Sequence, residues 1–174
     1  QMQLPAGEYR AMVHFEQVLP PDNKPEVKQI RSRIRINAAV YAHVGELIET
    51  AEITQVRITN DQVEVDINNT GNTHVRLDGQ WGVWNAAQYP GADATHQIVG
   101  LGKESTQLPD GLLSADFLPR TPVLPGHQRT LKFTLTDLPQ ESQQLVLDMD
   151  AQFANQALDR AESFHWAGHA EQDP

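Results

Sequence analysis

Cysteine is absent from this chain, and several kinds of chemistry are absent with it. A chain without thiols forms no disulfide, has no thiolate nucleophile and holds no zinc–thiolate centre. Its apolar runs are also too short to span a bilayer, so we expect no insertion into a membrane. The lack of cysteine does not identify a compartment, because it fits the cytosol and the periplasm equally.

Basic residues are scarce. The chain has 13 lysines and arginines against 23 aspartates and glutamates, which gives a formal net charge of −10 at pH 7. A protein that neutralises phosphates needs a basic face, so this charge argues against a nucleic-acid partner. With 174 residues, the chain is long enough for one ordinary domain, or for one complete domain and part of another.

Helical patterns are nearly missing too, and the short segment 155–162 is the best helix candidate. Apolar and polar residues instead alternate with a period of two, which is typical of half-buried strands. The first such stretch covers residues 9–17, and its apolar side consists of Tyr9, Ala11, Val13 and Phe15. We expect further strands at 27–44, 53–59, 62–68, 74–84, 129–136, 145–153 and 163–166.

Turn residues separate these stretches. Residues 69–72, Asn-Thr-Gly-Asn, tolerate positive φ and predict a tight hairpin between strands 63–68 and 74–84. Residues 85–122 are rich in Gly, Pro, Ala and Asp, which indicates a long connection with short strands or a turn of helix. Many short strands separated by turns predict an all-β fold, an immunoglobulin-like β-sandwich.

No constellation of side chains points to an enzyme, a metal or a cofactor. The nearest histidine pair, His165 and His169, lies near the C-terminus and lacks further ligands of the usual spacing. The paired carboxylates in "VEVDIN" and "LVLDMDAQ" alternate with apolar residues, so we expect them on solvent-facing sides of strands rather than in an acid/base pair. No Gly-x-Ser-x-Gly motif is present.

Two tryptophans allow two interpretations. Trp81 and Trp84 are three residues apart on an expected strand, so they should face opposite sides of the sheet. One of them would pack in the core, and the other would cover a rim or an interdomain contact. Alternatively, an exposed tryptophan could stack on a sugar, which would suit a secreted β-sandwich that serves as an adhesion or carbohydrate-binding module.

The segment that begins at Val27 carries the only concentrated positive charge. Arg31, Arg33 and Arg35 face one side of the expected strand, and the other side consists of Ile30, Ser32, Ile34 and Ile36. Three arginines on one face cannot all be buried without partners, so they line a surface or a cleft. They either guard a sheet edge against aggregation or offer guanidinium groups to a carboxylate, while the strand offers a partner an edge for pairing.

Four segments resemble a known family. "LPAGEYRAMVHFEQVLPP" (4–21) and "VKQIRSRIRINAAVYAHVG" (27–45) are similar to the end of the first domain of the periplasmic pilus chaperones of the chaperone–usher pathway. "VDINNTGNTHVRLDG" (65–79) and "LPRTPVLPGHQRTLKF" (118–133) are similar to parts of the second immunoglobulin-like domain of that family. The resemblance implies that residues 1–44 hold the last strands of one such domain and that residues 45–174 form the next.

The family resemblance also implies a function. Chaperones of this family act in the periplasm, donate a strand to an incomplete pilus subunit and pass the subunit to an outer-membrane usher. The donated side chains would be those of Ile30, Ile34 and Ile36. The terminal carboxylate of the subunit would be anchored by one of Arg31, Arg33 and Arg35, in place of the lysine that the family has in its cleft.

This sequence departs from the family pattern in two respects. The apolar series of the donor strand is interrupted by Ser32, and the earlier strands of the first domain have no counterpart in these residues. Two strands alone leave ladder edges open and half a core uncovered. We therefore expect a partner, a second copy of the chain or a swapped arrangement to stabilise them.

Overall fold

The computed structural model describes residues 4–18, 32–92, 95, 98, 101, 108–154 and 156–168. Within them the chain forms antiparallel strands, so the predicted all-β fold is confirmed. The strands are β1 (Gly7–Glu16), β2 (Arg35–Val44), β3 (Ala51–Thr59), β4 (Gln62–Asn69), β5 (Asp78–Asn85), β6 (Leu112–Phe117), β7 (Gln128–Thr134), β8 (Gln143–Phe153) and β9 (Gln156–Trp166). No helix among the described residues is long and apolar enough to cross a membrane.

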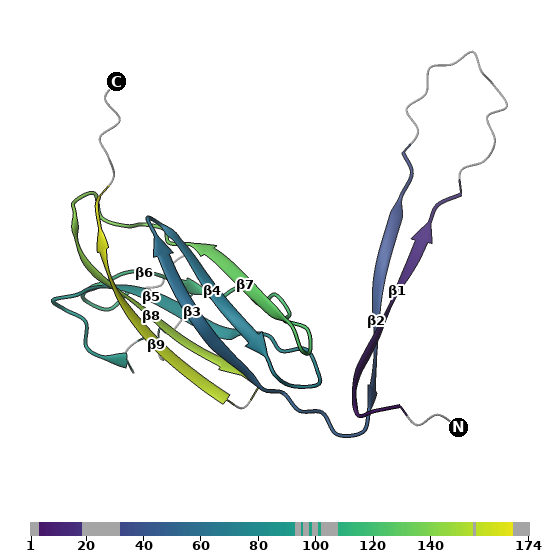
Figure 1. Ribbon diagram of the computed structural model, residues 1–174. Coiled ribbons are helices and arrows are strands. Elements are labelled where there is room, and N and C mark those ends of the chain that lie inside the picture. Colours follow the sequence, from purple (N-terminus) through teal and green to yellow (C-terminus); the bar gives the residue numbers. More distant parts are fainter. Residues whose placement is uncertain are drawn as a thin grey trace, which may run out of the picture. The chain divides into compact units, whose positions relative to one another are not determined.

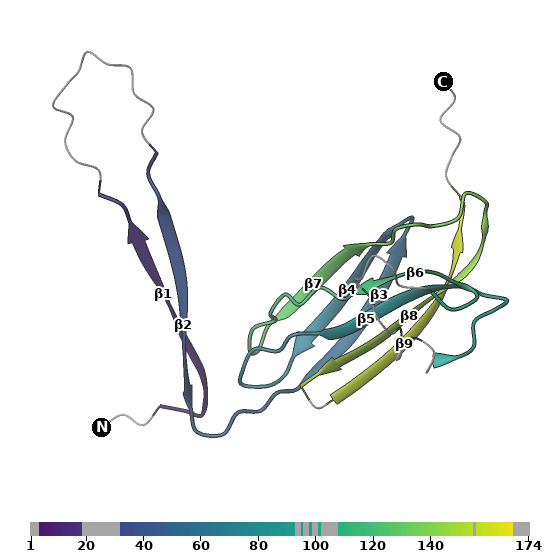
Figure 2. The same ribbon diagram turned by 180° about the vertical axis from the view of Figure 1, so that it is seen from behind.

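The chain divides into two compact units, Gln1–Leu47 (unit 1) and Ile48–Pro174 (unit 2). The resemblance had placed a break after Val44. Unit 1 contributes a two-stranded sheet of β1 and β2, and unit 2 contributes two sheets with strand orders β3-β4-β7 and β6-β5-β8-β9 (Figures 1 and 2).

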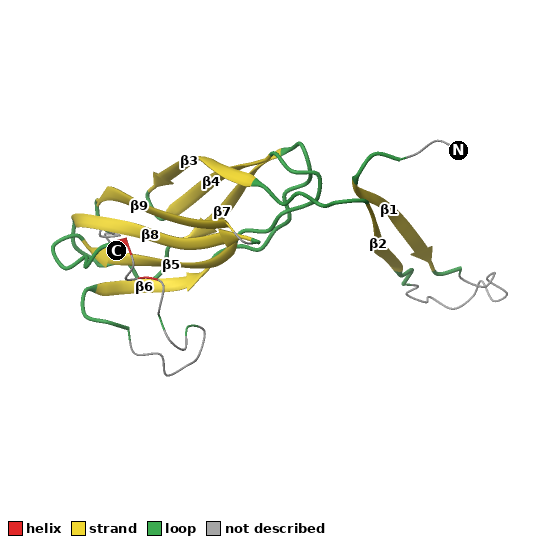
Figure 3. Ribbon diagram, turned by 90° about the horizontal axis from the view of Figure 1, so that it is seen from below, coloured by secondary structure: helices red, strands yellow, loops and turns green. Residues whose placement is uncertain are grey.

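The two sheets of unit 2 form a sandwich (Figure 3). Their strand orders match the A-B-E and C-F-G sheets of the immunoglobulin fold, with β6 added beside the C strand. The core lies between the sheets, where Trp81 of β5 stacks on Phe133 of β7 with ring centroids 5.6 Å apart. On β4 the alternation works as predicted, because Val63, Val65 and Ile67 are buried while the residues between them face outward.

The predicted hairpin at residues 69–72 is wrong. Strand β4 pairs with β3 and β7, and β5 pairs with β6 and β8, so the turn passes from one sheet to the other. The turn is held by distant residues, since the Thr70 and Gly71 amides donate to the Thr50 carbonyl and the Asn72 amide donates to the Ile48 carbonyl. A Cβ atom at Gly71 would lie 2.1 Å from the Ile48 oxygen, so this close approach requires glycine.

The helix candidate at 155–162 is wrong as well. The described part of this segment belongs to β9, which pairs with β8 along its whole length from Phe153↔Gln156 to Gln143↔Trp166. In β9, Leu158 and Phe164 pack against the core, and the alternate residues Asp159, Ala161 and Ser163 are exposed. Pairing with a long neighbouring strand outweighs the weak helix propensity of this segment.

Unit 1 is a β-ribbon, and we use this name for β1 and β2 together. The two strands pair in register from Gly7↔Val44 to Glu16↔Arg35. Of the predicted strand 27–44, residues 32–34 precede the ladder, and 27–31 lie outside the described residues. An isolated two-stranded sheet is marginally stable in water, so the ribbon requires further contacts to persist.

Candidate functional site

One face of the ribbon is apolar along its length, and we call it the apolar face. Register pairs Tyr9, Ala11, Val13 and Phe15 with Ala42, Val40, Ala38 and Ile36, and Ile34 extends the series beyond the ladder. Most of these side chains are exposed, with Ile34 at 59% and Ile36 at 60% of their full accessible surface. An exposed apolar surface of this kind is typical of an interaction site.

At one end of this face, the predicted isoleucines border a hollow. Ile34, Ile36 and Phe15 line it together with Glu16 and Gln17, and its volume is about 300 Å³. The Gln17 amide donates to the Ile34 carbonyl at 2.9 Å, which holds the two chains together just past the last strand pair. The third predicted residue, Ile30, lies outside the described residues.

The opposite face of the ribbon carries the arginines. Arg33 Nη1 donates to Glu16 Oε1 at 2.8 Å and Arg35 Nη2 donates to Glu16 Oε2 at 3.0 Å. Both arginine side chains are exposed, and an exposed ion pair contributes only about 0–1 kcal/mol, so a competing carboxylate could displace Glu16. Arg31 lies outside the described residues.

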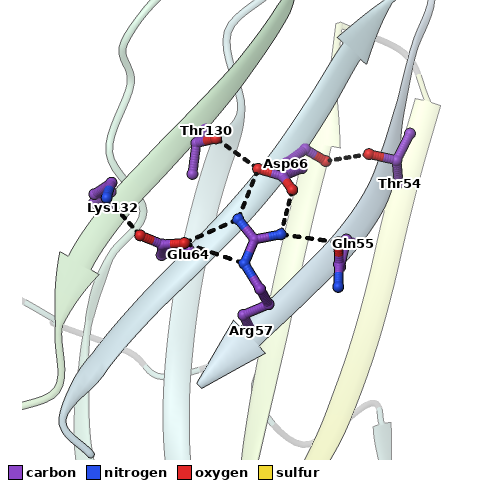
Figure 4. A network of polar contacts seen from close by, with 7 residues as sticks. All are labelled: Thr54, Gln55, Arg57, Glu64, Asp66, Thr130 and Lys132. Atoms are coloured by element: carbon purple, nitrogen blue, oxygen red, sulfur yellow. Dashed lines mark hydrogen bonds and ion pairs between the residues drawn. The ribbon is translucent and has the colours of Figure 1, made fainter. Parts of the chain in front are cut away.

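The outer face of the β3-β4-β7 sheet carries a network of charges (Figure 4). Arg57 donates to Glu64 and Asp66, Lys132 donates to Glu64, and Thr130 donates to Asp66. The Lys132 and Arg57 hydrogen bonds lower the pKa of Glu64, and those from Arg57 and Thr130 lower the pKa of Asp66. Both carboxylates therefore stay ionised at neutral pH, which suits a surface network and not general acid catalysis. They lie on the outer face of the sheet, as predicted (Figure 4).

The two tryptophans face opposite sides of the sheet, as predicted, but neither is exposed. Trp81 lies in the core, and Trp84 is 2% exposed on the outer side of β5. There it forms a second apolar cluster with Ile98, Leu112 and Val146, beneath residues of the connection between β5 and β6. The outer face of this sheet is thus covered locally, which leaves no tryptophan surface for a sugar.

A buried carboxylate lies beside Trp84. The expectation that Asp148 faces solvent is wrong, because the same connection covers it and leaves it 0% exposed. The Thr95 hydroxyl donates to Asp148 Oδ2 at 2.6 Å and accepts from Trp84 Nε1 at 3.1 Å. Burial raises the pKa of Asp148, and Asp150 and Asp159 add to the increase, while hydrogen bonds from Thr95 and Tyr89 oppose it.

The raised pKa of Asp148 gives its contribution to stability a definite sign. The pKa of Asp148 is higher in the folded than in the unfolded chain. Asp148 therefore contributes its whole stabilising free energy at pH values below the unfolded pKa, and this contribution is lost as the pH rises through the folded pKa. The free energy of unfolding of the wild type, relative to Asp148→Asn, should therefore decrease as the pH rises above about 4, the usual pKa of an aspartate in the unfolded chain. Urea denaturation at a series of pH values measures this difference.

Asp66→Asn is the control, because a lowered pKa has the opposite effect. Its wild-type advantage is lost as the pH falls below about 4 through the folded pKa, so this difference curve should rise with pH below about 4, whereas that of Asp148→Asn should fall with pH above it. A flat difference curve for Asp148→Asn would contradict the assigned burial.

An exposed serine–histidine pair consists of Ser142, which precedes β8, and His165 of β9. Ser142 Oγ lies 3.2 Å from His165 Nε2, and Gln144 Nε2 lies 3.3 Å from His165 Nδ1. The donor and acceptor roles of the two ring nitrogens depend on the tautomer of His165. The group beside Nδ1 is the Gln144 amide, and not the carboxylate that orients the base in a Ser-His-Asp triad.

No group of three or more His, Asp or Glu side chains among the described residues is arranged to hold a metal ion. His165 is described, whereas His169, the other member of the nearest histidine pair, lies outside the described residues.

Comparison with known proteins gives little similarity. No protein-family model matches the sequence. No curated protein matches it either. Among solved structures, the chain is similar to Spo0M, a sporulation control protein from Bacillus subtilis, with 13% identity and a TM-score of 0.26. The match covers 74% of this chain and 51% of that one, so the chain spans about half the length of Spo0M.

Proposed function

We propose that this chain is a non-enzymatic periplasmic chaperone that binds pilus subunits by strand addition and passes them to an outer-membrane usher. The observation that carries the proposal is the exposed apolar face of the ribbon. The sequence resemblance in both units supports it, as does the immunoglobulin-like topology of unit 2.

The ribbon offers both parts of a strand-addition site. Within the described residues, β1 is the only strand that pairs with β2, so the other edge of β2 can accept a strand through main-chain hydrogen bonds. The alternating side chains of Ile34 and Ile36 would set the register of the bound subunit. The same open edges would also allow the chain to associate with itself.

The carbohydrate-binding alternative loses its structural support. It required a tryptophan on the surface, and both Trp81 and Trp84 are 2% exposed. Residues of the connection between β5 and β6 pack over Trp84.

Strand addition predicts that polar substitutions on the apolar face will abolish capture. We expect the double variant Ile34→Ser, Ile36→Ser to retain at most about a tenth of the pilin that co-purifies with the wild type from periplasm, since each isoleucine buried at an interface contributes about 1.5–3 kcal/mol. The matched control is Met12→Ser, Tyr41→Ser, which changes two exposed apolar side chains on the other face of the ribbon. Equal loss in both variants would argue against a face-specific site.

A second variant tests whether the arginines anchor the carboxylate of the subunit. Replacing Arg31, Arg33 and Arg35 together with glutamine should weaken capture while unit 2 keeps its thermal unfolding transition, because none of these residues belongs to that unit. Unchanged co-purification of the pilin with this triple variant would count against the anchoring role.

A further inference from the structure

A polar pocket lies at the end of unit 2 where Glu49 precedes β3. Its volume is about 230 Å³, and its lining includes Glu49, His74, Arg76, Asp78, Arg120 and Gln152. The lining comes from the turn between β4 and β5, the segment after β6 and the end of β8, so the fold brings together residues far apart in sequence. No residue of the ribbon takes part, and the pocket is therefore independent of the function proposed above.

Two guanidinium groups are positioned in this pocket. Arg76 Nη1 donates to the Arg120 main-chain carbonyl at 2.7 Å, which fixes the Arg76 side chain against the neighbouring segment. Arg120 Nη2 lies 3.1 Å from Asp78 Oδ2, so the charge of Arg120 is already paired within the pocket.

Arg76 differs from Arg120 in its pairing. None of the described carboxylates forms an ion pair with Arg76, although the chain has a net charge of −10 and acidic residues are plentiful. A guanidinium carries five N–H donors in a planar fork, and the contact with Arg120 uses one nitrogen. The remaining donors suit a group with two coplanar oxygens.

The charges that line the pocket select among such groups. Asp78 is already paired with Arg120, and Glu49 adds a second negative charge to the lining. The Arg76 guanidinium, which has no ion pair with a described carboxylate, therefore matches a ligand with one negative charge, such as a carboxylate, better than a phosphate, which carries up to two near neutral pH. The volume is several times the roughly 30 Å³ that a water molecule occupies in the liquid, so the carboxylate can enter with the atoms that carry it.

We propose that this pocket binds a single carboxylate group, held by N–H donors of Arg76 with Arg120 alongside. The carboxylate belongs either to a small organic acid or to the C-terminus of a peptide. Both sources present the same planar pair of oxygens to the guanidinium.

The test is an NMR titration of the full chain with four probes: sodium acetate, inorganic phosphate, N-acetyl-triglycine and the amide of N-acetyl-triglycine. We expect the two carboxylate probes to shift the backbone amides around Arg76 and Arg120 saturably, with a Kd of about 1 mM. The peptide amide should cause no saturable shift, since it lacks the carboxylate. Tighter binding of the peptide acid than of acetate supports a peptide terminus, and equal binding supports a small acid.

The matched variants are Arg76→Gln and Arg129→Gln. Arg129 also donates through Nη1 to a main-chain carbonyl, that of Pro122 at 3.0 Å, but it does not line the pocket. We expect Arg76→Gln to weaken binding of the peptide acid about tenfold and Arg129→Gln to leave it unchanged. The proposal is overturned by equal weakening in both variants, by shifts from the amide that match those from the acid, by tighter binding of phosphate, or by no saturation up to about 100 mM.

Discussion

Replacing Asn69 with alanine is expected to lower the free energy of unfolding of unit 2 by about 2–4 kcal/mol. The Asn69 side chain is buried, and its Nδ2 donates to the carbonyls of Thr73 at 2.8 Å and Val123 at 2.9 Å. Its Oδ1 accepts from the Gly71 amide at 2.9 Å. Alanine removes these hydrogen bonds at once and leaves buried main-chain groups with fewer partners, each at a cost of about 1–3 kcal/mol.

Asn68→Ala is the matched control for this substitution. Asn68 is the preceding residue on the same strand, but its amide faces outward and donates to the exposed Glu52. Its replacement should change stability by no more than about 0.5 kcal/mol. Urea denaturation followed by circular dichroism compares the two variants, and similar midpoints for both would show that the turn is not held by Asn69.

Trp84→Ala is expected to destabilise unit 2 by about 3–5 kcal/mol, the usual range for a fully buried large aromatic side chain. The loss includes packing against Ile98, Leu112 and Val146. It also removes the indole N–H that donates to the Thr95 hydroxyl, and that hydroxyl in turn holds Asp148.

This substitution separates the two interpretations of the tryptophan. A surface tryptophan that stacks on a sugar could be truncated with little effect on folding, whereas the buried Trp84 cannot. Phe117→Ala is the control, since Phe117 is an exposed aromatic residue on β6 of the same sheet and should cost no more than about 0.5 kcal/mol. Equal melting temperatures for Trp84→Ala and the wild type would contradict the burial of Trp84.

The fold could be predicted where the pattern is local. Alternation assigned the inward side chains of β4 and the two faces of the ribbon, because the period of two is a property of each strand by itself. The turn at residues 69–72 could not be assigned, because the same residues suit a hairpin and a crossing between sheets. What decides between them is bonding to Thr50 and Val123, which are remote in sequence.

The sequence also could not predict which residues are buried by segments that are distant along the chain. Trp84 and Asp148 lie on what alternation marks as an outer face, and a connection without a repeating pattern covers both. For the candidate site, the separation of Ile34 and Ile36 from Arg33 and Arg35 follows from alternation alone. The pairing of both arginines with Glu16 follows only from the register of the ribbon.

No local pattern in the sequence predicts the pocket at Arg76 and Arg120. The two residues are brought together by the crossing between sheets and by the bridge between Val75 and Val123. A prediction of the correct crossing would have been needed to find them.

All three tryptophans of the chain, Trp81, Trp84 and Trp166, lie in unit 2 and are buried. Unit 1 contains tyrosines but no tryptophan. Emission excited at the red edge of the absorption band therefore comes from unit 2 alone, from indoles that are shielded from solvent. The ribbon gives no emission at this excitation wavelength, because it has no tryptophan. A tryptophan introduced at Phe15 would therefore give each unit its own fluorescent reporter within one unlabelled protein.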